Sequence, residues 1–290
     1  MSKQSGHTSP LAPVADRVAT GVGVVRYVWT HPANRGHRGR ALLRAAGYQA
    51  RSGLLRRRVL ARLGEKSLLW VDRHRTAAAM VIYANPPDLP EMLAWRHALR
   101  DGGLFLDVGA NVGTYTIWAA ELGAEVIALE PAPDTFRLLQ ENIALNGYLI
   151  TAVRAAAGDH CGTARFTAGL DAGNSLAPDG PVVTELVTVD SLIGDRRLAG
   201  MKVDVEGFEI DVLRGAARAL AQRRIDLIQV EWNQASRFAV GTDRRPVAEL
   251  LAGYGYRLYR PDPTGRLIPV ADPQFGADVF ARPAIEGDRP

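Results

Sequence analysis

The stretch that decides the fold is Phe105-Leu106-Asp107-Val108-Gly109-Ala110-Asn111-Val112-Gly113, followed by Val126-Ile127-Ala128-Leu129 and Glu130. An apolar strand, a turn through two glycines and a helix over 114–122 predict the first half of a nucleotide-binding unit. The glycines stand as G-x-x-x-G, and Asn111 occupies the place where a dinucleotide fingerprint has its middle glycine. A side chain there would crowd a pyrophosphate, so the sequence disfavours a nicotinamide dehydrogenase.

A ligand with an amino-acid tail in place of phosphates does not need that close approach, and S-adenosylmethionine is such a ligand. Its carboxylate could use backbone N–H groups at the start of the helix, and its ammonium could be held by carbonyl oxygens and by Asp107. The sequence therefore predicts an S-adenosylmethionine site at this turn, with Asp107, Gly109, Asn111 and Gly113 as candidates.

Two further acidic residues are candidates for binding the nucleoside part of this cofactor. Glu130 follows Gly109 by 21 residues, close to the separation at which a carboxylate accepts both ribose hydroxyl protons. The structural alternative for Glu130 is a helix N-cap, because Pro131 and Pro133 open the next helix. Asp159 would suit the adenine amino group, and a plain turn residue is the alternative.

The composition is that of a globular protein with one substantial core. The chain has 290 residues, of which 47% are hydrophobic and 23% are charged. It has no apolar run of about 18 residues, and its first six residues lack the charged start and apolar middle of a secretory signal. A single cysteine, Cys161, excludes an intrachain disulfide and a multi-cysteine zinc site. We therefore expect a soluble, cytoplasmic protein without a transmembrane segment.

Charge is divided unevenly along the chain. Residues 1–66 carry a net charge of +11, and the remaining residues carry −7. Such a basic arm could meet nucleic acid, anionic lipid or a phosphorylated substrate. The plain alternative is a solvated helical face, because 32 of the 35 basic residues are arginine throughout the chain. We favour a small-molecule or glycan acceptor over a nucleic-acid partner.

The sequence pattern divides the chain into four segments. They are a basic, partly disordered to helical extension (1–66), a cap and lead-in segment (67–100), an S-adenosylmethionine-binding domain (101–283) and a frayed tail (284–290). In the first two segments we expect loosely ordered chain up to about residue 38 and a helical pattern over 40–63. We also expect a strand pair formed by 67–71 and 79–83.

Strands and helices alternate in the domain, which indicates an α/β fold with a Rossmann-like, mostly parallel sheet of seven strands covered on both faces. The expected strands are 104–108, 125–129, 151–155, 201–205, 226–231, 255–259 and 277–281. The expected helices are 114–122, 133–145, 209–221 and 244–252. An insertion over 160–190 is expected to hold a short strand pair, 163–167 and 185–189, around a polar loop.

The segment Lys202-Val203-Asp204-Val205-Glu206-Gly207 places three ionisable side chains at the end of a strand that is expected to be buried on both faces. Such groups are costly to desolvate and shift one another's pKa values, which indicates a candidate site, although a structural ion-pair network has the same effect. We take Asp204, Glu206 and Lys202 as the catalytic candidates. Glu209 ranks below them, because complementing the dipole of the following helix would explain it.

Other patterns carry less weight. Asp204, Glu231 and Asn233 could gather Mg²⁺, but this spacing of oxygen ligands is generic, and the default expectation is no metal. Asn85-Pro86-Pro87-Asp88 is similar to the motif of amino-methylating nucleic-acid enzymes but lacks the aromatic residue that stacks the flipped base. His160 could serve as a base, although a loop histidine is more often solvated.

With these residues in view, the chain resembles the FkbM family of S-adenosylmethionine-dependent methyltransferases over about residues 90–232. The resemblance rests on residues 107–113, Glu130-Pro131, Asn142 to Asn146, Gly173-Asn174-Ser175-Leu176, Val187 to Leu192, Lys202 to Gly207 with Glu209, Leu213-Arg214-Gly215, and Glu231. It implies a class I methyltransferase fold and methyl transfer to a hydroxyl or carboxyl oxygen of a secondary metabolite or a glycan sugar. The chain departs from the family pattern at Phe208, where a small residue is common.

Under this resemblance the enzyme must align an oxygen nucleophile with the S–CH₃ bond and exclude water. Asp204 or Glu206 would act as the base or orient the acceptor, Lys202 would tune the pair, and Asn174 and Ser175 would close over the substrate. Two rival interpretations stay open: an RNA or other nucleic-acid methyltransferase that uses the basic arm, and a non-catalytic scaffold of the same fold. The intact acidic and glycine positions argue against the scaffold.

Overall fold

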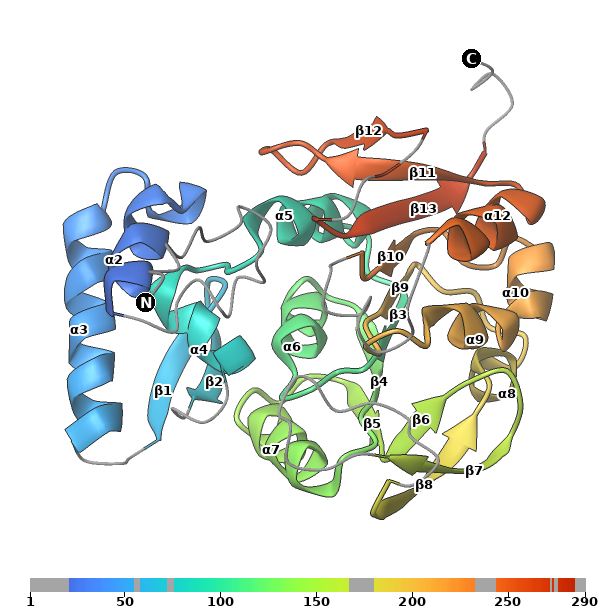
Figure 1. Ribbon diagram of the computed structural model, residues 1–290, viewed down its shortest axis with the longest axis horizontal. Coiled ribbons are helices and arrows are strands. Elements are labelled where there is room, and N and C mark those ends of the chain that lie inside the picture. The colour runs from blue at the N-terminus through green and yellow to red at the C-terminus, as the bar shows by residue number, and fades with distance from the viewer. Residues whose placement is uncertain are drawn as a thin grey trace, which may run out of the picture.

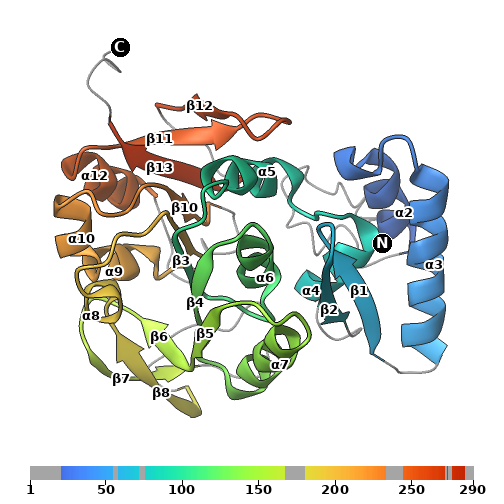
Figure 2. The ribbon, with the colours of Figure 1, turned by 180° about the vertical axis from the view of Figure 1, so that it is seen from behind.

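The computed structural model describes residues 21–54, 58–71, 76–166, 180–232, 244–271, 273 and 276–284. Its centre is an eight-stranded sheet (Figures 1 and 2). In spatial order the strands are β12 (Leu267–Pro269), β11 (Tyr256–Pro261), β13 (Val279–Pro283), β10 (Ile228–Val230), β9 (Gly200–Val203), β3 (Leu104–Val108), β4 (Glu125–Leu129) and β5 (Ile150–Val153). The strands from β10 to β5 run parallel, whereas β13 and β12 run in the opposite direction. The predicted α/β class and mostly parallel sheet are confirmed, with β12 as an eighth strand.

The order of the strands indicates where a ligand would bind. From β3 the chain continues to β4 and β5 on one side, and it later returns to β9 and β10 on the other side. The strand order therefore reverses between β3 and β9, and ligands of such sheets bind beyond the carboxyl ends of the strands at this point. All five residues of β3 are buried, as expected for a strand covered on both faces.

Alternate side chains of the central strands enter two separate cores. Leu104, Leu106 and Val108 pack on one face with the last four helices, whereas Phe105 packs on the other face with three earlier ones. The last four helices are α8 (Val189–Ile193), α9 (Glu209–Arg214), α10 (Ala217–Ala221) and α12 (Arg245–Gly253), and the earlier ones are α5 (Leu89–Ala98), α6 (Thr114–Glu121) and α7 (Pro133–Ala144) (Figure 1). Within the described ranges, no helix has the length and apolar character needed to cross a bilayer.

Two predicted elements of this domain are divided in the structure. The strand predicted at 151–155 splits into β5 and β6 (Ala155–Ala157), and β6 forms a separate sheet with β8 (Val182–Val187) and β7 (Gly162–Phe166). The helix predicted at 209–221 splits into α9 and α10 around Gly215. A Cβ atom on Gly215 would lie 2.0 Å from the Gly158 carbonyl oxygen, so the glycine lets the end of α9 approach the end of β6.

The N-terminal extension has more regular structure than the sequence predicted. It contains α2 (Gly21–Thr30), the 3-10 helix η1 (Pro32–Asn34) and α3 (Arg38–Leu54). The prediction of loose chain is therefore wrong for residues 21–34. Val24 and Val28 of α2 are buried, so tertiary packing orders a segment whose local composition is typical of a loop.

The strand predicted at 79–83 is also wrong. These residues belong to α4 (Thr76–Tyr83), and the partner of β2 (Ser67–Val71) is β1 (Val59–Leu63), which the helical pattern had absorbed. A short apolar run looks the same in a buried helix and in a buried strand. Only the pairing partner distinguishes the two, and it lies outside the run itself.

Two asparagine side chains, one in α7 and one in the turn after it, bind the free edge of β2. The Trp70 N–H donates to Asn142 Oδ1 at 2.8 Å, and the Leu68 N–H donates to Asn146 Oδ1 at 2.9 Å. Asn142 Nδ2 in turn donates to the Val112 carbonyl oxygen at 2.8 Å. The hairpin β1–β2 is thus tied through one asparagine to the turn formed by residues 109–113, hereafter the glycine turn.

Asn85 has a structural role in the same hairpin. Its side chain accepts from the Gly64 N–H at 2.7 Å and donates to the Gly64 carbonyl oxygen at 3.0 Å. These bonds account for the asparagine of the Asn-Pro-Pro pattern without base recognition.

Candidate active site

Strand register brings polar side chains into one row on the face of the sheet that carries α5 and α6. Asp107, Lys202 and Gln229 are direct cross-strand neighbours on β3, β9 and β10, and each is at most 4% exposed. Side chains of a strand alternate between the two faces, so Asp204 and Glu231, two residues further along their segments, continue the row towards the carboxyl edge. The sheet itself thereby gathers ionisable groups that are distant in sequence.

Lys202 is the cation at the centre of this row. Its Nζ lies 2.5 Å from Asp204 Oδ2 and 4.7 Å from the centre of the Tyr115 ring. Burial opposes the charge of Lys202, but the carboxylates of Asp204, Asp107 and Asp278 outweigh it and raise its pKa above the ordinary value. Lys202 therefore stays charged and stabilises negative charge on its neighbours.

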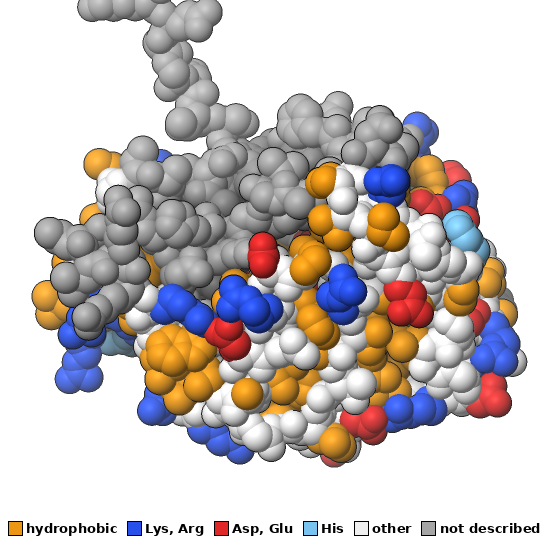
Figure 3. All heavy atoms as spheres, turned by 90° about the horizontal axis from the view of Figure 1, so that it is seen from below, with side chains coloured by type: hydrophobic (Ala, Val, Ile, Leu, Met, Phe, Trp, Pro, Cys, Tyr) orange, Lys and Arg blue, Asp and Glu red, His pale blue; other side chains and the backbone are white. Residues whose placement is uncertain are grey.

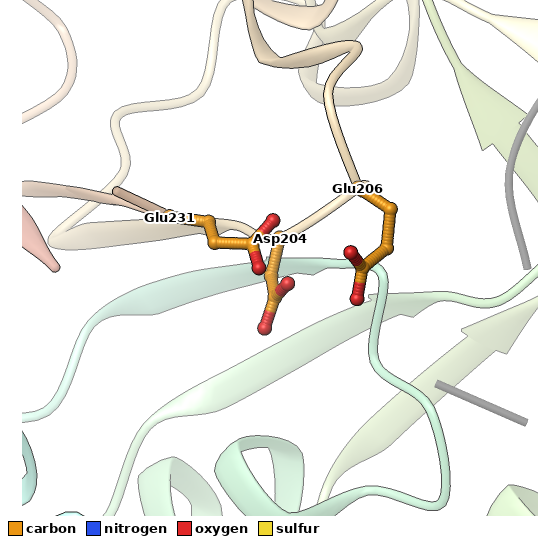
Figure 4. Close-up of side chains that lie close together, drawn as sticks. All are labelled: Asp204, Glu206 and Glu231. Carbon is orange, nitrogen blue, oxygen red and sulfur yellow. The ribbon is translucent and has the colours of Figure 1, made fainter. Parts of the chain in front are cut away.

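Three carboxylates converge at the carboxyl edge of the sheet. Figure 4 shows Asp204 and Glu206 coming from the segment after β9 and Glu231 coming from the end of β10. Their oxygen atoms lie within 4.8 Å of one another. Burial, with the charges of Asp204 and Glu209, raises the pKa of Glu206 to about 8. Burial and the same group of carboxylates also raise the pKa of Glu231 well above its ordinary value.

This arrangement matches the predicted Mg²⁺ ligands in part. Asp204 and Glu231 are brought together, Glu206 joins them, and Asn233 lies outside the described residues. Three carboxylate oxygens at this spacing suit a hard divalent cation, which prefers oxygen ligands.

The turn that carries Glu206 has an uncommon backbone conformation. Glu206 has φ of 53°, and it is one of three non-glycine residues with positive φ in the described part of the chain. The following Gly207 donates its N–H to Glu209 Oε1 at 2.9 Å, and the buried Glu209 also forms an ion pair with Arg244. Glu209 is therefore more than a complement to a helix dipole, because it supports the turn that presents Glu206. Its partner Arg244 carries no local sequence signal for this role.

Gly109 is required by a close approach of two backbones. Its φ is +82°, and a Cβ atom there would lie 1.9 Å from the Asp204 carbonyl oxygen. The glycine turn and the segment that carries Asp204 therefore pack directly against each other. The sequence explains the glycine by a tight turn, but its contact with Asp204 follows only from the tertiary structure.

Asp107 lies beneath the glycine turn and is almost completely buried. Its Oδ2 accepts a hydrogen bond of 2.6 Å from the Thr116 hydroxyl on α6, whereas its buried Oδ1 has no hydrogen-bond partner among the described residues. Burial raises the pKa of Asp107, and Lys202 and Thr116 act in the opposite direction. A buried carboxylate oxygen with spare acceptor capacity suits a cationic group of a ligand.

Glu130 holds the glycine turn to the start of α7. Its Oε2 accepts from the Asn111 N–H and its Oε1 accepts from the Ala132 N–H, each at 2.9 Å. Ala132, and not Glu130, is the N-cap residue of α7, and no side chain caps this helix, so the alternative of Glu130 as the N-cap is wrong. Each carboxylate oxygen can accept a second hydrogen bond, and the ribose role stays a prediction.

The glycine turn is also closed by its own hydrogen bonds. Asn111 has φ of 51°, and its Oδ1 accepts from the Val112 N–H at 2.8 Å. The Gly113 N–H donates to the Ala110 carbonyl oxygen at 2.9 Å. The turn is thus pre-organised, with a strained non-glycine residue at its middle, as is common at ligand sites.

The remaining predicted residues lie apart from this cluster or outside the described chain. Asp159 is exposed in the turn between β6 and β7, where its Oδ1 lies 2.6 Å from His160 Nδ1. Its contact with adenine stays a prediction. Asn174 and Ser175 lie outside the described residues.

Sequence reasoning missed a second polar group beside Lys202. Gln229 Nε2 donates to Asp278 Oδ2 at 2.7 Å, and the Tyr115 hydroxyl donates to Asp88 Oδ2 at 3.1 Å. Burial and the charge of Asp204 raise the pKa of Asp278 to about 6. Gln229 was detectable, because it stands two residues before Glu231 on an otherwise apolar strand. Asp278 was not, since it lies just before the antiparallel strand β13, near the end of the chain.

Comparison with known proteins gives one family match. The family model described as "Methyltransferase FkbM domain" matches residues 107–258. The chain is similar to "Hexuronic acid methyltransferase AglP" of Haloferax volcanii, with 28% identity over 152 residues that cover 50% of this chain and 60% of that protein. It is similar to "Methyltransferase 1" of Beauveria bassiana, with 28% identity over 151 residues that cover 40% of this chain and 59% of that protein. The chain thus spans about three fifths of the length of these relatives.

Similarity to solved structures is lower. The 16S rRNA N2 G1207 methyltransferase of T. thermophilus, in complex with AdoMet and guanosine, has 17% identity and a TM-score of 0.42, covering 79% of this chain and 50% of that one. The precorrin-6y C5,15-methyltransferase of Geobacter metallireducens has 14% identity and a TM-score of 0.38, covering 66% of this chain and 87% of that one.

Proposed function

The chain belongs to the FkbM methyltransferase domain family, and from that premise we propose that it is an S-adenosylmethionine-dependent O-methyltransferase acting on a hydroxyl, or a carboxyl, of a glycan sugar or secondary metabolite. The observation that carries the proposal is the contact between the glycine turn and the Asp204 segment, through Gly109 and the Asp204 carbonyl oxygen. It joins a cofactor-type turn to a cluster of carboxylates. The glycan class is supported by the relative named for hexuronic acid methylation.

Three acidic residues would bind this cofactor. Asp107 Oδ1, buried and without a hydrogen-bond partner among the described residues, would accept from the ammonium of the methionine part. Glu130 would accept from the ribose hydroxyls, and Asp159 would bind the adenine amino group. When bound, the cofactor supplies an activated methyl group. The protein has to position the acceptor oxygen and take up its proton.

We assign different roles to the two carboxylates of the Lys202 segment. Asp204 is held at 2.5 Å by the charged Lys202, which suits a group that orients the acceptor hydroxyl. Glu206 has a pKa of about 8 in this cluster, and a base with a pKa near the working pH takes up a proton most effectively. Glu206 is therefore the proposed general base, and Asn174 and Ser175 would cover the acceptor.

The test compares two variants of the site with a matched control. Glu206→Gln and Asp204→Asn should each lower turnover by about 10²-fold or more, measured with labelled methyl donor on a panel of neutral hexoses, hexuronic acids and hydroxylated macrocycles. Cofactor affinity, measured by calorimetry, should change little. Glu185→Gln, an exposed acidic residue on β8, is the control. The assignment fails if both site variants turn over at the wild-type rate.

A calorimetric titration with MgCl₂ tests the metal version of the same site. Asp204, Glu206 and Glu231 would hold the ion and present it to the acceptor oxygen. Binding to the wild type that is weakened by Glu231→Gln supports a metal-assisted reaction, whereas the absence of binding leaves the acid–base version.

A further inference from the structure

Helix α2 presents an apolar stripe to solvent. Val22, Val25 and Trp29 are 81%, 52% and 50% exposed, and their spacing of three and four residues places them on one side of the helix. The opposite side of α2 is already used, because Val24 and Val28 are buried against the extension. The stripe is therefore not needed for the fold of the extension.

The helices that carry the stripe have basic but no acidic side chains. Residues 21–54 contain six arginines and no aspartate or glutamate. Arg26, Arg35, Arg40 and Arg51 are exposed, and the Arg38 guanidinium lies 5.2 Å from the centre of the Trp29 ring. By contrast, the face of the molecule seen from below mixes basic, acidic and apolar side chains (Figure 3).

The position of these helices leaves them accessible. α2 and α3 lie at one end of the molecule, and α3 forms its outer edge on the side away from the central sheet (Figures 1 and 2). A flat partner could therefore meet the extension without covering the carboxyl edge of the sheet.

We propose that this surface, formed by Val22, Val25 and Trp29 with the arginines of residues 21–54, docks the protein on an anionic lipid surface. A stripe of valine and tryptophan beside arginine is the chemistry of a helix that lies in the interfacial region of a membrane. The arginines supply attraction to anionic headgroups. This inference is independent of the proposed methyl acceptor.

The same observations disfavour two other occupants. Exposed aliphatic side chains add little to contacts with a phosphate backbone, which rely on charged and polar groups. A second copy of this chain would bring two basic surfaces together, and like charges oppose that association.

The experiment measures co-sedimentation of the full chain with vesicles. Vesicles of phosphatidylcholine containing phosphatidylglycerol should bind the protein, whereas vesicles of phosphatidylcholine alone should not. Binding should fall steeply with rising salt concentration, because the attraction is screened. The triple variant Val22→Ser, Val25→Ser, Trp29→Ser should lower the apparent affinity by at least about tenfold.

Matched variants separate this surface from general effects. Leu149→Ser, Val183→Ser and Ile268→Ser change exposed apolar residues elsewhere in the chain, and their combination should leave vesicle binding unchanged. Arg26→Gln with Arg40→Gln should weaken it, and the exposed pair Arg154→Gln with Arg266→Gln should do so less. Circular dichroism checks that each variant is folded.

Two outcomes overturn the proposal. The first is that the wild type ignores phosphatidylglycerol vesicles. The second is that the control variants lose as much binding as the α2 variants.

Discussion

The N-terminal extension and the carboxyl edge of the sheet use charge in opposite ways. Residues 21–54 contain six arginines and no acidic residue, and most of these arginines are exposed. At the edge of the sheet Asp107, Asp204 and Asp278 act on the buried Lys202, and Glu206 and Glu231 lie beside Asp204. Exposed charges are solvated and cost little, whereas buried charges are costly unless they are paired. A buried charged residue at the sheet therefore indicates a functional site by itself. An exposed arginine of the extension indicates one only together with the exposed apolar stripe beside it.

The largest expected difference between the two regions is the change in the free energy of unfolding when one cationic side chain is replaced. Lys202→Met should lower the free energy of unfolding by about 3–5 kcal/mol, because it leaves Asp107 and Asp204 without their buried partner. Arg40→Met in the extension should change it by no more than about 0.5 kcal/mol. Urea unfolding measures both values. Similar losses for the two variants would contradict the distinction drawn between them.

A smaller but still large contrast concerns two glycines. Gly109→Ala should destabilise the protein by about 1–3 kcal/mol from its backbone conformation alone, and the clash with the Asp204 carbonyl oxygen adds to this. Gly47 lies within α3, and a Cβ atom there would meet nothing within 4 Å. Gly47→Ala should therefore stabilise the protein by about 0.5–1 kcal/mol. Thermal unfolding of the two variants shows whether each one is destabilised or stabilised. A stabilised Gly109→Ala would refute the close approach of Gly109 to the Asp204 carbonyl oxygen.

The pH dependence of the free energy of unfolding tests whether Glu206, at the carboxyl edge of the sheet, has a raised pKa. Its carboxyl titrates near 4.5 in the unfolded chain and at about 8 in the folded protein. Between these pH values the folded state holds a proton that the unfolded state has released, so raising the pH lowers the free energy of unfolding. Glu206→Gln removes this titration and should become more stable relative to the wild type as the pH rises towards 8. Parallel stability curves for the two proteins would show that burial does not raise this pKa.

Glu121 should give a smaller effect of opposite sign at the junction between the extension and the domain. Burial opposes its charge, but hydrogen bonds from the Ser67 hydroxyl and from the N–H groups of Glu65, Ser67 and Lys66 outweigh burial and lower its pKa. Its contribution is present above pH 4.5 and is lost as the pH falls through the lowered value. Glu121→Gln should cost about 1–2 kcal/mol at neutral pH, and the difference from the wild type should shrink in acid. Denaturant unfolding at several pH values tests both points.

The sequence by itself determined seven of the eight strands of the α/β sheet, the glycine turn and the Lys202 to Gly207 segment. Each of these rests on local information: an apolar run of strand length, a glycine at a turn, or charges that interrupt a buried strand. The sequence failed at 79–83, where a short apolar run fits a helix and a strand equally well, and at 21–34, where packing overrides composition.

The tertiary structure alone decided how these pieces form a site. Strand register, which depends on which strands pair, put Lys202 between Asp107 and Gln229 and brought Asp278 from the end of the chain. It also gave Gly109 its contact with Asp204 and Glu209 its partner Arg244. These contacts join residues that are far apart along the chain. Local sequence patterns do not predict them, because the contacts form only when the strands pair and the two faces of the sheet are buried.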